Sequence, residues 1–183
     1  MKFSDEQKLI VLMLADLYNS QKNANIASYE LDPNFIKEAI FSNNTWAIPW
    51  RFPGIEFSNN EPPEYIRELF DILDMWSSIE NKQKKLGTEK THKILINNEI
   101  KPIEAEFIGF SSMNEGEYIT ATRFIIEELE RFTQFKGRYL VSQWDTLSRY
   151  RRMLKIFENI PNSNLVTYNE ELSEKNFIEL LKA

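Results

Sequence analysis

The chain contains few of the side chains that most enzymes use for chemistry. It has no cysteine, one histidine (His92) and five glycines among its 183 residues. Disulfides, thiolate nucleophiles and cysteine metal sites are therefore excluded, and there is little glycine for phosphate-binding loops. The sequence predicts a protein that is not an enzyme and that needs no cofactor.

The single histidine lies at the spacing of a known metal motif. Glu89 and His92 form a Glu-x-x-His pair, which in di-iron bundles occurs twice together with further glutamates. No second histidine exists, and Lys90 and Lys93 beside the pair would repel a cation. We expect a solvated histidine and no metal. A Ser-His-Asp triad is equally disfavoured, because no G-x-S-x-G turn is present.

Paired carboxylates could perform acid–base chemistry without histidine. Asp71 and Asp74 lie one helical turn apart, and a second group follows at Glu127, Glu128 and Glu130. Both groups flank apolar stripes, which is typical of the solvated side of a helix. A carboxylate-dependent enzyme, with its pocket under the aromatic segment described below, is therefore the third hypothesis for function.

Composition indicates one globular domain spanning residues 1–183. Hydrophobic residues make up 42% of the chain and charged residues 27%, with a net charge of −6. An acidic chain has little general affinity for nucleic acid or anionic membranes. The apolar run from Leu9 to Ala15 follows Asp5 and Glu6 and is too short to span a bilayer, so we expect a cytoplasmic protein and no membrane association.

The first helix is predicted to be unusually apolar. Ser4 and Gln7 have the spacing of a capping box, and apolar residues then occupy most sides of the helix until about Asn19. Such a helix is buried on more than one side or lies at a subunit interface. We therefore expect a homo-oligomer.

Helical periodicity recurs along the rest of the chain, whereas no segment alternates as a strand does. The sequence predicts an all-α, single-domain bundle of about six helices. The second helix is expected to begin at Asp32-Pro33, and the third to run from about Pro63 to Leu86. The fourth runs from a cap at Asn114 and Glu117 to about Phe135, and the fifth from Ser142 to Asn159. The sixth begins at Ser173. Residues 88–106 are expected to be an irregular connection.

An aromatic and proline-rich segment, residues 43–63, separates the second and third helices. Its prolines forbid a long helix, and its rings favour an ordered loop. Trp46, Trp50 and Phe52 are candidates for a ligand or partner surface, since tryptophan is enriched at binding hot spots. The alternative is a loop that covers one end of the bundle.

The second half of the chain carries a recognisable pattern of aromatic, glycine and charged positions: Phe107, Gly109, Phe110, Glu115, Tyr118, Arg123, Phe124, Arg131, Phe135, Tyr150, Arg152, Met153, Leu154, Phe157, Pro161, Leu172 and Ser173. With these residues the chain resembles the YfbU family of bacterial proteins. The first half matches in outline, and the match is loose at residues 43–63 and 88–106. The resemblance implies an all-helical, cytoplasmic bacterial protein and carries no known activity.

Six polar residues within the resembling segment are further candidates for a binding site: Glu115, Tyr118, Arg123, Arg131, Tyr150 and Arg152. They lie on the two predicted helices most expected to pack together. They form either a hydrogen-bonded network that fixes the helix crossing, which we favour, or a patch that binds an anion or a partner.

Two basic stretches could contact phosphates, but no nucleic-acid motif accompanies them. One comprises Lys82, Lys84, Lys85, Lys90 and Lys93, and the other Arg149, Arg151 and Arg152. The favoured function is a non-enzymatic protein–protein interaction module. A regulatory factor that binds nucleic acid or a partner through the arginine-bearing helices is the alternative.

Overall fold

The computed structural model describes residues 3–21, 32–53, 61–160 and 172–183, and within these ranges the protein is all-α. Its helices are α1 (Asp5–Gln21), α2 (Pro33–Phe41), η1 (Thr45–Ala47), α3 (Ile48–Arg51), α4 (Glu64–Leu86), α5 (Thr88–Asn97), η2 (Pro102–Ala105), α6 (Gly116–Glu127), η3 (Thr133–Phe135), α7 (Leu147–Phe157) and α8 (Glu174–Leu181). Two strands of two residues, β1 (Phe110–Ser111) and β2 (Val141–Ser142), pair in parallel. None of the helices in these ranges is long and apolar enough to cross a membrane.

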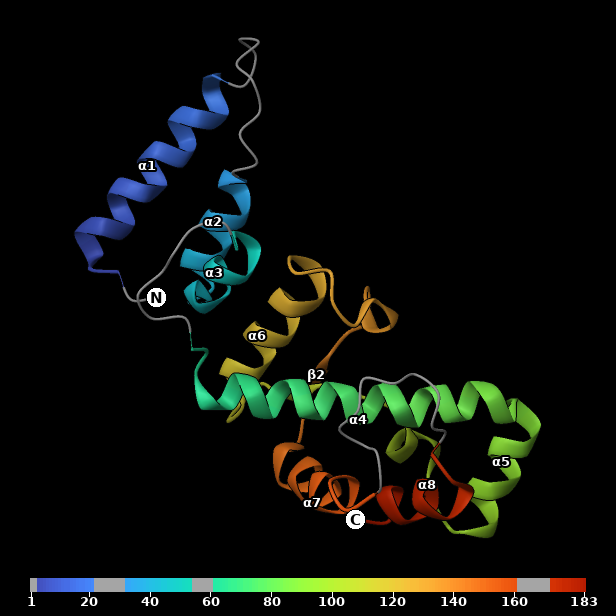
Figure 1. Ribbon diagram of the computed structural model, residues 1–183. Helices are drawn as coiled ribbons and strands as arrows, with labels where there is room; N and C mark the ends of the chain where they lie inside the picture. The colour runs from blue at the N-terminus through green and yellow to red at the C-terminus, as the bar shows by residue number, and fades with distance from the viewer. Residues whose placement is uncertain (1–2, 22–31, 54–60, 161–171) are drawn as a thin grey trace.

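Helix α4 is the central element of the fold. It crosses the molecule as one long rod, with α6 on one side and α7 and α8 on the other (Figure 1). Its apolar stripe is fully buried, including Leu69, Leu73 and Trp76. The predicted helix from Pro63 to Leu86 is thus confirmed, and it ends at Gly87, whose positive φ of 78° turns the chain directly into α5.

The N-terminal helix lies apart from α4 and packs against α2 (Figure 1). Its predicted capping box is confirmed. The backbone amide of Gln7 donates to Ser4 Oγ at 3.3 Å, and the backbone amide of Ser4 donates to Gln7 Oε1 at 2.9 Å. The cap of α2 is confirmed as well, since Asp32 accepts from the amides of Asn34 and Phe35.

Two segments predicted to lack regular structure contain helices, which raises the number of α-helices in the described ranges from the predicted six to eight. Helix α5 fills the first half of residues 88–106, and α3 lies within residues 43–63, of which 54–60 are outside the described residues. The spacing of apolar residues did not predict α5, because Ile94 and Leu95 are the residues that this ten-residue helix buries and two neighbours make no repeat. It failed for α3 because a single turn contains no repeat.

The predicted boundaries of α6 and α7 are wrong. Helix α6 ends at Glu127 instead of near Phe135, because Glu130 and Phe132 have positive φ angles of 51° and 54° and reverse the chain. This reversal places the Phe132 ring 5.8 Å from that of Phe70. Asn114 does not cap α6; its amide instead bonds the Asp145 carboxylate. Helix α7 begins at Leu147 instead of Ser142, because Ser142 belongs to β2.

Candidate interaction surfaces

The largest group of exposed apolar side chains on one element lies on α1. Six of its residues, each between 38% and 64% exposed, form what we call the outer face of α1: Leu9, Ile10, Met13, Leu14, Leu17 and Tyr18. The expectation that this helix is buried on more than one side is therefore wrong within the described protomer. The alternative expectation, a subunit interface, stays a prediction.

The opposite side of α1 is fixed to the body by specific contacts. Ala15 is buried against α2, Lys37 pairs with Asp16 at 2.5 Å, and Asn19 bonds Asn34 at 2.9 Å. These contacts turn the helix so that its inner side faces α2. The outer face consequently points away from the protomer.

The three aromatic candidates of residues 43–63 lie together but mainly cover the core. Trp46 is buried, and its Nε1 donates to Asn44 Oδ1 at 2.9 Å. Phe52 is buried with its ring 6.1 Å from that of Phe35. Trp50 is 39% exposed and its ring lies 5.1 Å from that of Trp46. Trp50 is thus the one candidate of the three that offers substantial surface to a partner.

Glu115 lies in a buried hydrogen-bond network. Its carboxylate accepts from the backbone amides of Ser111 at 2.7 Å, Thr146 at 3.0 Å and Leu147 at 2.7 Å. Two of these donors are the first amides of α7, which otherwise have no side-chain cap. The Glu115 carboxylate thus ties β1 to the start of α7, where a negative charge is stabilised.

Tyr118 belongs to a second cluster that joins α4, α6 and α7. Its hydroxyl donates to Glu68, whose carboxylate also accepts from Arg151 Nε at 2.6 Å and Nη2 at 3.0 Å. The Arg151 guanidinium lowers the pKa of Glu68, whereas burial, together with the hydrogen bond to Glu68, raises that of Tyr118. Sequence reasoning did not select Glu68, although it lies on the polar side of the α4 stripe.

The remaining polar candidates are dispersed. Tyr150 is buried and donates to the Gly109 carbonyl at 3.0 Å. Arg131 lies beyond α6 with its guanidinium 5.3 Å from the Phe70 ring, and Arg152 donates to the carbonyl of Ser148. Arg123 is exposed. The structure therefore brings Glu115 and Tyr150 to the same stretch of backbone around Gly109, and the six residues do not form one patch.

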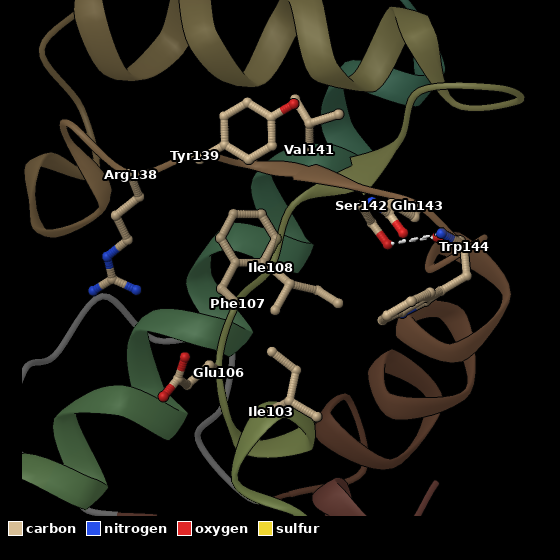
Figure 2. A pocket seen from close by; sticks show the side chains of 10 residues that line it. All are labelled: Ile103, Glu106, Phe107, Ile108, Arg138, Tyr139, Val141, Ser142, Gln143 and Trp144. Carbon is tan, nitrogen blue, oxygen red and sulfur yellow. Dashed lines mark hydrogen bonds between the residues drawn. The ribbon is translucent and has the colours of Figure 1, made fainter.

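A shallow hollow of about 390 Å³ lies between η2 and the segment around β2. Figure 2 shows Arg138 on one side of the hollow and Trp144 on the other, with Ile103 and Ile108 between them. Arg138 is held by Glu80 in a bidentate pair of 2.7 and 2.8 Å. Trp144 and Tyr139 were not predicted as candidates for a binding surface, although both are strongly exposed. Their position outside every predicted apolar stripe could have indicated that they do not belong to the core.

The described residues contain no group of three or more His, Cys, Asp or Glu side chains that could hold a metal ion. His92 lies exposed on α5. Asp71 and Asp74 lie one turn apart on α4. Their pKa values are raised, mainly by partial burial and secondly by repulsion from neighbouring carboxylates.

The fold and these surfaces define an all-α protein in which buried polar side chains such as Glu115 and Tyr150 hold elements together. Among the described residues, the largest group of exposed apolar side chains on one element lies on α1. The model of the YfbU domain matches residues 1–183, which is the entire sequence. The chain therefore belongs to the YfbU family.

Proposed function

We propose that this protein is a non-enzymatic interaction module that binds another protein chain through the outer face of α1. The observation that supports this proposal is the exposure of six large apolar side chains on one side of one helix. Contiguous apolar patches of this kind on soluble proteins mark interaction sites. A chain without cysteine suits the reducing cytoplasm, where we expect it to act.

The energetics favour a reversible contact. Full burial of a leucine, isoleucine or methionine side chain contributes about 1.5–3 kcal/mol. Since roughly half of each of the six side chains is exposed, covering them contributes about 6 kcal/mol per face. This is comparable to the cost of association, about 4–15 kcal/mol. A matching apolar surface on the partner is therefore needed for binding.

The geometry gives less support to the alternatives. All three arginines in the α7 stretch have partners within the protomer. Arg151 pairs with Glu68, Arg149 donates to the carbonyls of Glu104 and Leu181, and Arg152 donates to the carbonyls of Ser148 and Ala183. None of the residues that line the hollow belongs to residues 43–63, under which the carboxylate-dependent enzyme would have its pocket. Glu106 is the one carboxylate in the lining, so the hollow offers no facing pair for acid–base work.

Affinity capture with matched variants tests the proposal. The wild type, Leu14→Glu and Ile96→Glu are each immobilised and exposed to lysate of the cells that naturally produce the protein. Ile96 is the control, because it is 60% exposed on α5, as Leu14 is 58% exposed on α1. We expect proteins that are retained by the wild type and by Ile96→Glu but lost with Leu14→Glu.

Retention of the same proteins by Leu14→Glu would contradict the proposal. Circular dichroism of the three proteins ensures that the comparison concerns surfaces and not folding, since substitutions at exposed positions change stability little.

A further inference from the structure

We propose that the chain bound by the outer face of α1 is a second copy of this protein, and that the two α1 helices pack antiparallel across a two-fold axis. This inference rests on the proposed function and specifies its partner.

The outer face is complementary to itself in shape. Leu9, Met13 and Leu17 form one ridge at i, i+4 spacing, and Ile10, Leu14 and Tyr18 form a parallel ridge beside it. Ridges of this spacing pack into the grooves of an identical helix in the commonest class of helix crossing. A two-fold axis uses the same patch on both copies, so every apolar side chain of one face meets an apolar side chain of the other.

The lack of charged side chains on the outer face also favours a second copy of this protein as the partner. Asp16 is the one charged residue between Leu9 and Tyr18, and it lies on the inner side of α1, where it pairs with Lys37 of its own chain. A strongly charged partner surface would therefore bury unpaired charge against this face. An identical face brings no such charge.

The charges at the ends of α1 determine the orientation. Asp5 and Glu6 lie in the first turn, whereas residues 17–21 carry no charged side chain. A parallel pair would place the two acidic turns and the two positive helix ends side by side. An antiparallel pair crossing at Met13 and Leu14 separates the acidic turns by about 24 Å along the axis, because each turn lies about eight residues from the crossing and each residue adds about 1.5 Å.

The shape of the protomer agrees with this orientation. The first residues of α1 lie nearer to α4 than its last residues, which point away from the body (Figure 1). An antiparallel pair therefore places the two bodies toward opposite ends of the contact.

Light scattering of the purified protein tests whether the partner is a second copy of the chain. Across a concentration series from about 1 to 500 µM, we expect the wild type and Ile96→Glu to change from monomer to dimer mass. Leu14→Glu is expected to weaken the dimer at least tenfold, because each dimer would bury two carboxylates. A monomer at every concentration, or a dimer indifferent to Leu14→Glu, overturns the inference. If a different protein is still lost from Leu14→Glu in the lysate, the proposed function stands.

A spin label tests the orientation. Because the chain has no cysteine, Ser20→Cys introduces a unique thiol at the end of α1 while leaving Asp5 and Glu6 in place. In an antiparallel dimer we expect the two labels to lie more than about 20 Å apart, whereas a parallel dimer would bring them near the helix spacing of 8–10 Å. A short label distance in a dimer that is sensitive to Leu14→Glu overturns the antiparallel arrangement alone.

Discussion

At the scale of single residues, three buried or half-buried carboxylates connect elements that are far apart in sequence. Glu115 joins β1 to α7, Glu68 joins α4 to α7, and Glu80 joins α4 to Arg138. A buried carboxylate is tolerated when donors satisfy it. These contacts determine how the helices meet, which the apolar stripes alone do not specify.

Removing the Glu115 carboxylate should cost stability. In Glu115→Ala the amides of Ser111, Thr146 and Leu147 lose their acceptor inside the protein. We expect a loss of about 3 kcal/mol in the free energy of unfolding, measured by urea denaturation. Glu117→Ala, an exposed position in the same helix, is the control with a change under about 0.5 kcal/mol. Equal effects of the two substitutions would refute the role assigned to Glu115.

The Glu68 cluster predicts a specific pH dependence. Because Arg151 and Tyr118 lower the pKa of Glu68 in the folded protein, its ionised form contributes stability above its unfolded pKa of about 4.3. That contribution is lost as the pH falls through the lower folded pKa. Glu68→Gln should therefore be about 1 kcal/mol less stable than the wild type at pH 7, with the difference shrinking below about pH 4. Urea denaturation at pH 7 and pH 3 checks this, and an unchanged difference argues against it.

At the scale of elements, the approach of the two short strands depends on one glycine. Gly109 has a φ of 79°, and a Cβ added there would lie 2.0 Å from the Leu140 carbonyl oxygen. Its own carbonyl accepts the Tyr150 hydroxyl, so the segment cannot shift without breaking that bond. This explains physically why the position belongs to the pattern by which the sequence resembles the family.

Two glycine substitutions separate steric from conformational cost. Gly109→Ala should destabilise the fold by about 3 kcal/mol or more, since both the clash and the positive φ oppose it. Gly87→Ala has a similar φ of 78°, with a ψ of 161°, but open space around its Cβ, so we expect the smaller loss of about 1–2 kcal/mol from the backbone conformation alone. Thermal unfolding of both variants is the measurement, and a loss at Gly109 no larger than at Gly87 would contradict the close approach.

The sequence predicts elements best where local chemistry determines them. The stripe of α4, its stop at Gly87 and the caps at Ser4, Asp32 and Ser173 depend on neighbours in the chain, and all are confirmed. The end of α6 depends on Phe132 packing against Phe70, which is contributed by another helix. The partners of Glu115 are likewise set by distant residues, so no local pattern could assign them.

At the scale of the whole molecule, the fold separates a well-packed body from a helix with one exposed side. The core around α4 includes Trp76, Phe107 and Tyr150, whose rings lie within 6.0 Å of one another. Helix α1, by contrast, packs against α2 on its inner side, and the six side chains of its outer face are exposed. The body thus has a buried core of its own, whereas the outer face of α1 is exposed in the protomer.

Methionine oxidation measures directly whether that face is covered. Met13 is 64% exposed on the outer face of α1, whereas Met113 is 82% exposed between β1 and α6 and serves as an internal reference. Exposed methionines are oxidised by peroxide, and mass spectrometry reads each site separately. We predict that Met13 becomes protected relative to Met113 as the protein is concentrated from about 1 to 500 µM. Oxidation of Met13 as fast as that of Met113 at every concentration, and in native lysate as well, would contradict the account.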